Sequence, residues 1–415
     1  MRLVVVGGSG SSTPELIDAL EDWPGGVDRR PPMTVALVGR TTEKLEVVAA
    51  ECRARVRLPG PPLEIETATD RRRALEGADV VLDQVRVGGL AARVFDESFP
   101  WEFGLPGEET TGPGGFANAL RTVPARRGTW ADIRAIAPDA VVIDLTNPAG
   151  IVQQAAEREG GFRIVAVCDA PATFTRAIAV RLGRPVSRVV RRYVGTNHCG
   201  WYVPESPDEM DALADLVVGM DPSIVRLHGA VPSPYVRYYV NPDRMLDAQR
   251  GHETRARVLQ RIDAELLAGY AAATGEASAQ RGALRRGALR RGALWYPIAV
   301  VPFLDALVYG TDEPIILGVR NDGRVPGVPD PTIVEVPHVA PRPGEFVALE
   351  AAPLPPLPSL LLAQVGTYET LTVDALVPGA PPEARLRALL ANPLVRDADR
   401  AAALLAAIDA GSPVA

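Results

Sequence analysis

Two short stretches of the sequence bring side chains capable of chemistry to the ends of apolar runs. Residues 165–171 read VAVCDAP, so Cys168 and Asp169 follow a run directly, and residues 195–201 read GTNHCGW, with His198 at the centre. Three cysteines in 415 residues cannot form a disulfide framework, so we expect reduced thiols that are available for a metal or for chemistry. Alternatively, Cys168 and His198 are core residues and Asp169 is a turn residue.

A glycine turn follows the first apolar run, in GGSGSSTPEL. Gly8 and Gly10 would let backbone amides approach a pyrophosphate, and Ser11 and Ser12 lie in the same turn as further candidate cofactor contacts. Thr13 is the expected N-cap of the next helix, since proline and glutamate follow it. The third glycine of the usual dinucleotide fingerprint is absent, so an ordinary glycine turn stays open as the alternative.

The second apolar run ends in VALVGRTTEK, where an NAD site usually carries an acid that holds the ribose hydroxyls. Here Gly39, Arg40 and Thr41 stand instead. Arg40 could pair with a 2′-phosphate, which favours NADP or a relaxed choice of cofactor. A plain surface arginine is the alternative interpretation.

These candidates follow short β-branched runs that alternate with helical patterns. We predict strands at 2–6, 34–38, 79–82, 140–145 and 164–168, and helices in PELIDAL and TEKLEVVAAECRARV. Such alternation predicts an α/β protein with a doubly wound, Rossmann-like parallel sheet, whose ligands bind at the carboxyl ends of the strands. The functional side chains should therefore meet at that edge.

From about residue 200 the pattern is mixed, which predicts a C-terminal α+β domain. We expect a long helix at 243–272, strands in ALVYG, EPIILGV and TIVEV, a proline-rich connection at 352–359, and closing helices at 383–409 that break near Pro393. The predicted domains are residues 1–195 for the dinucleotide and residues 196–415 for catalysis, substrate binding and oligomerisation.

Composition excludes several classes of protein. A net charge of −7 with scattered arginines gives no nucleic-acid footprint, and no apolar run approaches the length of a membrane helix. The N-terminal MRLVVVGG lacks a signal-peptide pattern, so we expect a cytoplasmic protein. The repeat RGALRRGALRRGALW at 281–295 predicts a solvated basic helix or loop, because a period of five fits neither a solenoid nor one helical face.

Six motifs, in this order and spacing, together resemble glycoside hydrolase family 4, the NAD- and metal-dependent glycosidases that include 6-phospho-α- and 6-phospho-β-glucosidases. The resemblance runs, with gaps, from residue 1 to about residue 395. It rests on GGSGSSTPEL, DQVRVGGLAAR, GLPGEETTGPGGFANALRT, LTNPAGIV, VCDAP and GTNHCGW. It implies a fold similar to lactate and malate dehydrogenases.

The resemblance implies metal-binding or catalytic roles for four residues. Cys168 and His198 would bind a divalent metal, usually Mn²⁺, with water and substrate oxygens completing the shell. Asp169 matches the acid of the α-type members and is a candidate general acid, whereas many β-type members have asparagine there. Tyr235, in SPYVRYY, matches the catalytic base, with Tyr238 and Tyr239 as the other candidates; an aromatic packing stripe is the alternative. A tyrosine would need nearby positive charge to act as a base at neutral pH.

The resemblance further implies that Arg93, Asn147 and Arg255 contact the sugar or its phosphate. The implied reaction oxidises C3 of a glycoside with NAD, removes the C2 proton, eliminates the C1 group, adds water and returns the hydride. The expected partner is a small-molecule glycoside substrate, and neither nucleic acid nor a membrane is expected to bind. The family's members are commonly homodimers or homotetramers, so the same assembly is expected here.

Two departures from the family pattern leave alternatives open. Gly39 replaces the acidic ribose reader, and Glu108 in GEET replaces the usual glutamine, which adds negative charge where an anionic sugar phosphate should bind. An unphosphorylated glycoside therefore stays open. A non-hydrolytic NAD(P)-dependent sugar dehydrogenase or epimerase is the first rival function, and a catalytically silent dinucleotide-binding protein is the second.

Overall fold

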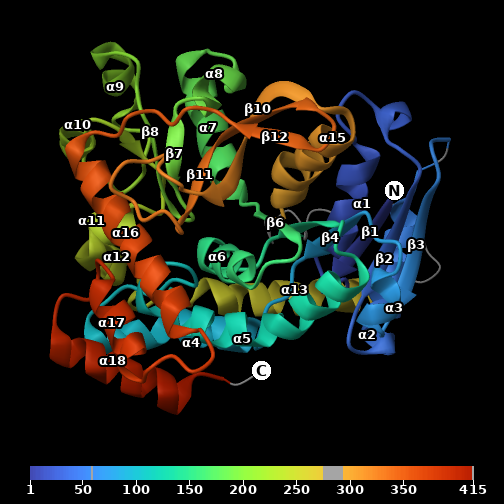
Figure 1. Ribbon diagram of the computed structural model, residues 1–415, viewed down its shortest axis with the longest axis horizontal. Helices are drawn as coiled ribbons and strands as arrows, with labels where there is room; N and C mark the ends of the chain where they lie inside the picture. The colour runs from blue at the N-terminus through green and yellow to red at the C-terminus, as the bar shows by residue number, and fades with distance from the viewer. Residues whose placement is uncertain (58, 274–292, 414–415) are drawn as a thin grey trace.

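A computed structural model describes residues 1–57, 59–273 and 293–413 of the chain (Figure 1). Most of the RGALR repeat, for which a solvated helix or loop is predicted, lies outside these residues. Within the described ranges, no helix combines the length and apolar character needed to cross a membrane.

The first half of the chain builds a six-stranded parallel sheet in the order β3-β2-β1-β4-β5-β6. Its strands are β1 (Arg2–Val6), β2 (Met33–Val38), β3 (Leu63–Ala68), β4 (Val80–Asp83), β5 (Val141–Asp144) and β6 (Arg163–Ala166). The order, with β1 inside and crossovers on both sides, confirms the predicted doubly wound sheet. Strand β3 is not among the predicted strands, because its LEIETA pattern alternates apolar side chains with glutamate, as suits a half-covered edge strand.

Helices cover both faces of this sheet, because alternate strand residues point to opposite sides. Leu3 and Val5 of β1 pack in one hydrophobic cluster with α1 and α2, and Val4 and Val6 pack in another with α5 and α6. Figure 1 shows the sheet between these layers. The helices are α1 (Thr13–Glu21), α2 (Thr42–Arg55), α3 (Arg71–Leu75), α4 (Gly89–Ser98), α5 (Gly112–Ile136) and α6 (Ala149–Glu159).

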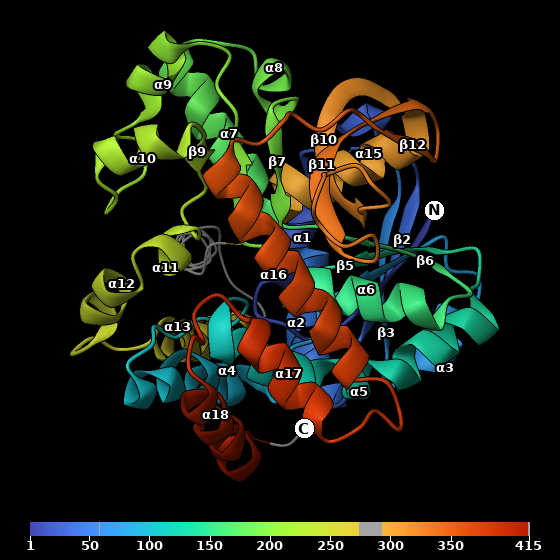
Figure 2. The same cartoon turned by 60° about the vertical axis from the view of Figure 1, so that its left-hand side comes forward.

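The second half adds an antiparallel sheet in the order β10-β11-β7-β8-β9, with β12 paired to β11. The strands are β7 (Tyr193–Thr196), β8 (Cys199–Tyr202), β9 (Val231–Pro232), β10 (Thr311–Arg320), β11 (Ile333–Arg342) and β12 (Glu345–Ala348). The long helix α16 (Pro356–Ala375) packs across β7 and β8 (Figure 2). The predicted mixed α+β half is confirmed, as are the strands in EPIILGV and TIVEV.

Three predictions for this half are wrong in detail. The run ALVYG belongs to α15 (Val301–Tyr309), since a short apolar run has the same pattern in a buried helix as in a strand. The helix predicted at 243–272 is two helices, α12 (Pro242–Gln249) and α13 (Arg255–Ala272), because Gly251 takes a φ of 78° and Thr254 caps α13 through its side chain. The proline-rich connection is partly helical, as α16 begins at Pro356, where the first turn tolerates proline.

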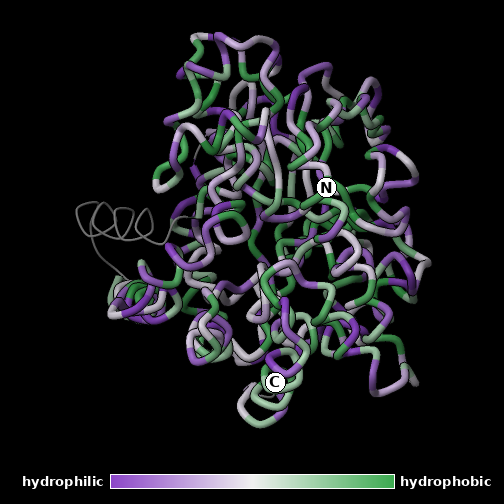
Figure 3. Tube along the Cα trace, turned by 90° about the vertical axis from the view of Figure 1, so that its left-hand side faces the viewer, coloured by the Kyte–Doolittle hydropathy of each residue, from purple (hydrophilic) through white to green (hydrophobic). Residues whose placement is uncertain are grey.

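The remaining helices surround the second sheet and close the chain. The break predicted near Pro393 is confirmed, because Pro393 lies between the last two helices of the chain. Hydrophobic segments run through the middle of the molecule, and the outer loops are largely hydrophilic (Figure 3). The elements not yet named are η1 (Val27–Arg29), η2 (Phe99–Phe103), α7 (Asp169–Leu182), α8 (Val186–Val190), α9 (Pro207–Leu213), α10 (Pro222–His228), α11 (Arg237–Val240), η3 (Tyr296–Val300), α17 (Glu383–Ala391) and α18 (Ala398–Gly411).

The two sheets share hydrophobic packing. Val142 of β5, Val194 of β7, Val334 of β11 and Leu362 of α16 belong to one continuous buried cluster. The parallel sheet and the antiparallel sheet therefore share one hydrophobic core. The boundary predicted between residues 195 and 196, which falls inside β7, stays a prediction.

Candidate active site

The turn between β7 and β8 carries His198. This residue adopts a positive φ of 60°, which is uncommon for a residue with a side chain. Asn197 secures the turn, because its Oδ1 accepts the amide of Ala149 at 3.2 Å and its Nδ2 donates to Glu335 Oε1 at 3.4 Å. These contacts tie the His198 turn to the start of α6, directly after the Asn147 turn.

Cys168 and Asp169 stand where β6 gives way to α7. Cys168 is the N-cap of α7, and its Sγ accepts the amide of Ala170 at 3.5 Å. The thiol also interacts with the imidazole of His198, which lowers the thiol pKa against the larger, raising effect of burial. Burial likewise raises the pKa of Asp169 above its usual value. A carboxyl group that holds its proton longer is better suited to act as a general acid.

Tyr235 lies between β9 and α11, and its ring stacks on the imidazole of His198. The ring centroids are 3.7 Å apart and the planes differ by 12°. The positive charge of His198 lowers the pKa of Tyr235, but burial and the charge of Glu108 raise it, to about 12 overall. The Tyr238 ring stacks on Tyr235 with 6.4 Å between the ring centroids, whereas Tyr239 is buried in the core. Of the three candidate bases, Tyr235 is the one in ring contact with His198.

Glu109 joins the residues predicted to contact the sugar. It forms ion pairs with Arg86 and, at 2.9 Å, with Arg93, and its Oε1 accepts Asn147 Nδ2 at 3.3 Å. Asn118 braces the same place by donating to the backbone oxygens of Glu109 and Asn147, at 2.9 and 3.0 Å. Burial acts to raise the pKa of Glu109, but the two guanidinium groups outweigh it and lower this pKa to about 2. The side chain is therefore a fixed carboxylate.

Glu108 faces the opposite way, toward His198. Its Oε2 lies 3.5 Å from His198 Nδ1 and accepts the amides of Thr110 and Thr111, both at 2.7 Å. Burial acts to raise its pKa, yet the charge of His198 and these amides bring the pKa below the usual value. The two adjacent glutamates thus serve separate partners: Glu108 faces His198, and Glu109 faces the two arginines.

Arg255, the first residue of α13, is exposed beside this arginine and glutamate cluster. The amide of the next residue, Ala256, donates to Glu97 Oε2 at 2.8 Å, and Glu97 Oε1 accepts Arg93 Nε at 2.6 Å. The start of α13 is therefore linked to Arg93 through Glu97.

The glycine turn is bonded to the end of β2. The amides of Gly7 and Gly8 donate to the carbonyl of Val38 at 3.2 and 2.8 Å, and a Cβ on Gly8 would lie 2.8 Å from Leu37 Cα. Glycine alone fits there, which suits a backbone cradle for a pyrophosphate. Gly10 closes the turn, since its amide donates to Gly7 O at 3.2 Å.

Helix α1 begins at Thr13, so the predicted N-cap is one residue late and Ser12 holds that position, without a side-chain cap hydrogen bond. Both predicted serines are buried: Ser11 Oγ donates to Asp263 Oδ1 at 2.7 Å, and Ser12 Oγ lies 3.5 Å from Tyr296 Oη. In addition, Tyr270 Oη donates to the carbonyl of Ser11 at 2.9 Å. Asp263, Tyr270 and Tyr296 come from far along the chain, and no sequence motif points to them.

The residues present fit a divalent transition metal and a dinucleotide. Cys168 and His198 bring together a thiol and an imidazole, two ligand types that suit a divalent transition metal. Among the described residues, no group of three or more histidine, cysteine or acidic side chains could hold a metal. Two protein donors therefore leave room for oxygens from elsewhere.

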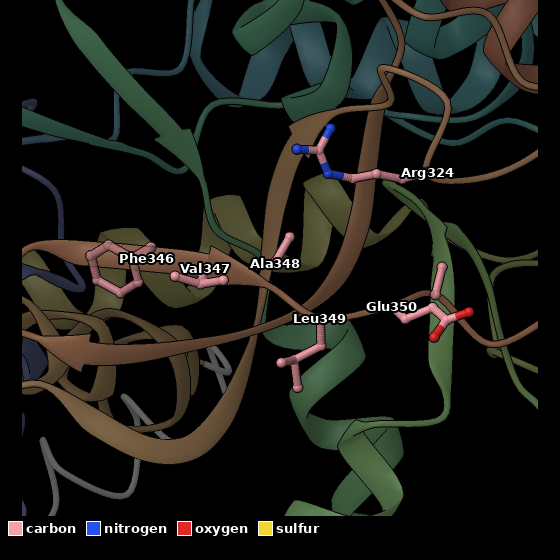
Figure 4. Close-up of a pocket in the computed structure, with 7 residues that line it drawn as sticks. Arg324, Phe346, Val347, Ala348, Leu349 and Glu350 are labelled. Atoms are coloured by element: carbon pink, nitrogen blue, oxygen red, sulfur yellow. The ribbon is translucent and has the colours of Figure 1, made fainter.

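A surface hollow lies away from these residues, beside β12 (Figure 4). It is lined by Arg324 and the segment 346–351. None of the predicted site residues belongs to this hollow.

The structure collects Cys168, Asp169, His198 and Tyr235 around one turn, with Glu108 and Glu109 linking them to Arg93 and Asn147. Glu109 is not among the predicted site residues, although its position in the GEET motif could have indicated it.

Comparison with known proteins gives one consistent result. A family model described as "Family 4 glycosyl hydrolase" matches residues 2–183, and one described as "Family 4 glycosyl hydrolase C-terminal domain" matches residues 193–395.

Among curated relatives, a "Probable 6-phospho-beta-glucosidase" of Bacillus subtilis is 29% identical, over 95% of this chain and 92% of the relative. A "6-phospho-alpha-glucosidase" of Leptotrichia buccalis is 26% identical, over 91% of this chain and 90% of the relative. A solved 6-phospho-beta glucosidase of Thermotoga maritima, with manganese, NAD⁺ and glucose-6-phosphate, has a TM-score of 0.83 and 26% identity, over 98% of this chain and 97% of its own.

Proposed function

The chain belongs to family 4 of the glycosyl hydrolases, and we propose that it hydrolyses 6-phosphoglucosides with a nicotinamide dinucleotide and a divalent metal such as Mn²⁺. When bound, the nicotinamide takes hydride from C3 of the sugar and later returns it, while the metal polarises the sugar oxygens. The remaining steps fall to side chains of this chain.

Tyr235 is the proposed base, which removes the proton from C2 of the oxidised sugar. Its pKa of about 12 is too high for that task, so it requires the positive charge that the Cys168 and His198 pair would hold beside it. Asp169 is the proposed acid, which gives a proton to the leaving oxygen on C1. Its raised pKa supports this role and favours a glycosidase over a dehydrogenase that needs no leaving-group acid.

Arg93 and Asn147 are proposed to orient the sugar. Glu109 holds both side chains, and such fixed donors position a substrate without having to be ordered at each turnover. Arg255 is proposed to meet the 6-phosphate from the start of α13, since an exposed guanidinium can hold two phosphate oxygens at once. Gly8, Gly10, Ser11 and Ser12 belong to the proposed cofactor turn.

The observation that carries the proposal is the meeting of Cys168, His198 and Tyr235, with Asp169 next to the thiol. The candidate metal-binding pair, base and acid thus gather around one turn. The test is hydrolysis of p-nitrophenyl α- and β-glucosides, with and without a 6-phosphate, in deuterated water with Mn²⁺, reductant and NAD or NADP. We expect release of p-nitrophenol that requires cofactor and metal, with deuterium at C2 of the product sugar.

Two variants sharpen this test. Tyr235→Phe should lose turnover by about 10²- to 10⁴-fold and keep cofactor affinity, whereas Tyr238→Phe, the matched control, should stay active. Asp169→Asn should slow alkyl glycosides far more than p-nitrophenyl glycosides, because only the poorer leaving group needs the proton. A fully active Tyr235→Phe would move the base elsewhere, and reduced cofactor that accumulates without p-nitrophenol would make the protein a dehydrogenase.

We further propose a cytoplasmic homodimer or homotetramer. All three cysteines are free, and a thiol ligand persists best in a reducing compartment. Exposed leucines on α10 and α16, two helices in contact, offer an apolar surface for a second copy. They are Leu227, Leu357 and Leu360. Light scattering coupled to gel filtration measures the assembly, and a monomer at working concentration would contradict it.

A further inference from the structure

The end of β2 lies directly against the glycine turn that is proposed to hold the pyrophosphate. The carbonyl of Val38 accepts the turn's amides, and the next residue, Gly39, packs on Ser9. A Cβ on Gly39 would come within 3.2 Å of Ser9 Cβ and 3.1 Å of Leu45 Cδ1. The adenosine ribose of a dinucleotide lies at this strand end in Rossmann-type sheets. The residues just after Gly39 are therefore the ones in reach of the ribose.

The charge at this strand end is positive. An NAD site usually carries a carboxylate for the ribose 2′-hydroxyl, but Gly39 has no side chain, and a longer residue would have to displace Ser9 or Leu45. Arg40 and Lys44 are both exposed, and neither forms an ion pair or hydrogen bond within the part of the chain that the structure describes.

The nearest acid along the chain, Glu43, is also exposed, and among the described residues it forms no ion pair with either cation. Its position one residue before Lys44 places it on another side of α2, since successive helical residues are turned by about 100°. Arg40 and Lys44 are four residues apart, and Arg40 directly precedes the N-cap Thr41. A guanidinium and an ammonium that lack carboxylate partners are the groups that recognise a phosphate monoester.

We propose that Arg40, with Lys44 as a second cation, binds the 2′-phosphate of NADP, so that this chain prefers NADP to NAD. The preference rests on the proposed use of a nicotinamide dinucleotide, but it concerns binding alone. The 2′-phosphate adds a charge-assisted contact that NAD cannot make, while the rest of the two cofactors is identical. The expected preference is about 10- to 100-fold in Kd, the size of one charged hydrogen bond.

The test is a direct binding titration, by calorimetry, of the full chain with NADP⁺, NAD⁺, adenosine 2′,5′-bisphosphate and AMP, without glycoside. Wild-type protein should bind NADP⁺ more tightly than NAD⁺ and the bisphosphate more tightly than AMP. Arg40→Ala should lose most of this preference and leave the Kd for NAD⁺ within about twofold, and Lys44→Ala should lose less. Arg387→Ala, an exposed arginine on α17, is the control and should change neither Kd.

Tighter binding of NAD⁺ than of NADP⁺ by the wild type, or an unchanged preference in Arg40→Ala, would overturn the assignment. Equal loss of both cofactors in Arg40→Ala would do the same, because it would show that Arg40 supports the turn and not the phosphate. Failure of the hydrolysis test with an intact NADP⁺ preference would instead reject the proposed function and leave the role of Arg40 standing.

Discussion

Replacement of Glu109 by glutamine tests whether this carboxylate organises the candidate site. The side chain is buried and pairs with Arg86 and Arg93, and these charges lower its pKa from 4.5 to about 2. At about 1.4 kcal/mol per pKa unit, the ionised form stabilises the folded chain by about 3 kcal/mol. Because the variant leaves two guanidinium groups without their shared partner, we expect Glu109→Gln to lower the free energy of unfolding at pH 7 by about 3 kcal/mol or more.

The pH dependence of the free energy of unfolding tests the direction of this effect. A lowered folded-state pKa stabilises the protein above the unfolded value of 4.5, and this stabilisation is lost as the pH falls toward 2. The difference between wild type and Glu109→Gln should therefore be nearly constant from pH 7 to 5 and shrink by about 1 kcal/mol between pH 4.5 and 3.5. Urea unfolding followed by fluorescence measures it at each pH.

Glu64→Gln, on the exposed side of β3, is the matched control and should change stability by less than about 0.5 kcal/mol at every pH. In catalytic assays, Glu109→Gln should raise KM for the sugar, because Arg93 and Asn147 lose their anchor, while the Kd of the dinucleotide stays the same. A variant as stable as wild type at pH 7, or a deficit that does not change with pH, would refute the argument from ion pairing.

Two further outcomes follow from buried carboxyl groups. Burial and the nearby Glu335 raise the pKa of Glu369 well above 4.5. The wild type therefore loses stability as the pH rises above 4.5, and Glu369→Gln should show a Tm gain over wild type that grows as the pH rises above that value. A pH-independent Tm difference would contradict this. Glu108 lies beside the ring of His198, so Glu108→Gln should weaken Mn²⁺ binding by about tenfold. Calorimetry in Mg²⁺-free buffer measures this affinity, with Glu64→Gln as the control. Unchanged affinity would show that the Glu108 carboxylate does not orient the imidazole.

The first sheet could be predicted from the sequence because its strands are buried on both faces and read as short β-branched runs. The edge strand β3 could not, since its glutamates remove that signal. The segment ALVYG was wrongly predicted as a strand for the opposite reason, because an apolar segment buried in helix α15 has the same pattern as a buried strand. The predicted helix at 243–272 is interrupted by Gly251, whose positive φ a hydrophobic pattern does not register.

The candidate site was predictable as a set of residues, through the family resemblance, but not as a geometry. Nothing in the sequence places the Tyr235 ring on His198, because packing of the whole β8–β9 region brings them together. The adjacent acids Glu108 and Glu109 look equivalent in GEET, yet one faces the imidazole and the other faces two arginines. Long-range ion pairs of this kind depend on the orientation of neighbouring elements, which local patterns do not encode.

The extra carboxylate of Glu108 raises the question of how an anionic sugar phosphate could bind. The structure shows that Glu108 accepts two backbone amides and faces His198, and that Arg93 is already held by Glu97 and Glu109. The buried charges around the sugar contacts therefore largely cancel, and they leave little net attraction for a phosphate.

A cation outside this balanced cluster must then provide the attraction, and Arg255 is the predicted one. Arg255→Ala should lower kcat/KM for a 6-phosphoglucoside by about 10- to 100-fold and leave kcat/KM for the unphosphorylated glucoside nearly unchanged. The ratio of the two values is the measurement, and Arg257→Ala, also exposed on α13, is the control. Equal losses on both substrates would show that Arg255 supports the start of α13 and that the phosphate is bound elsewhere.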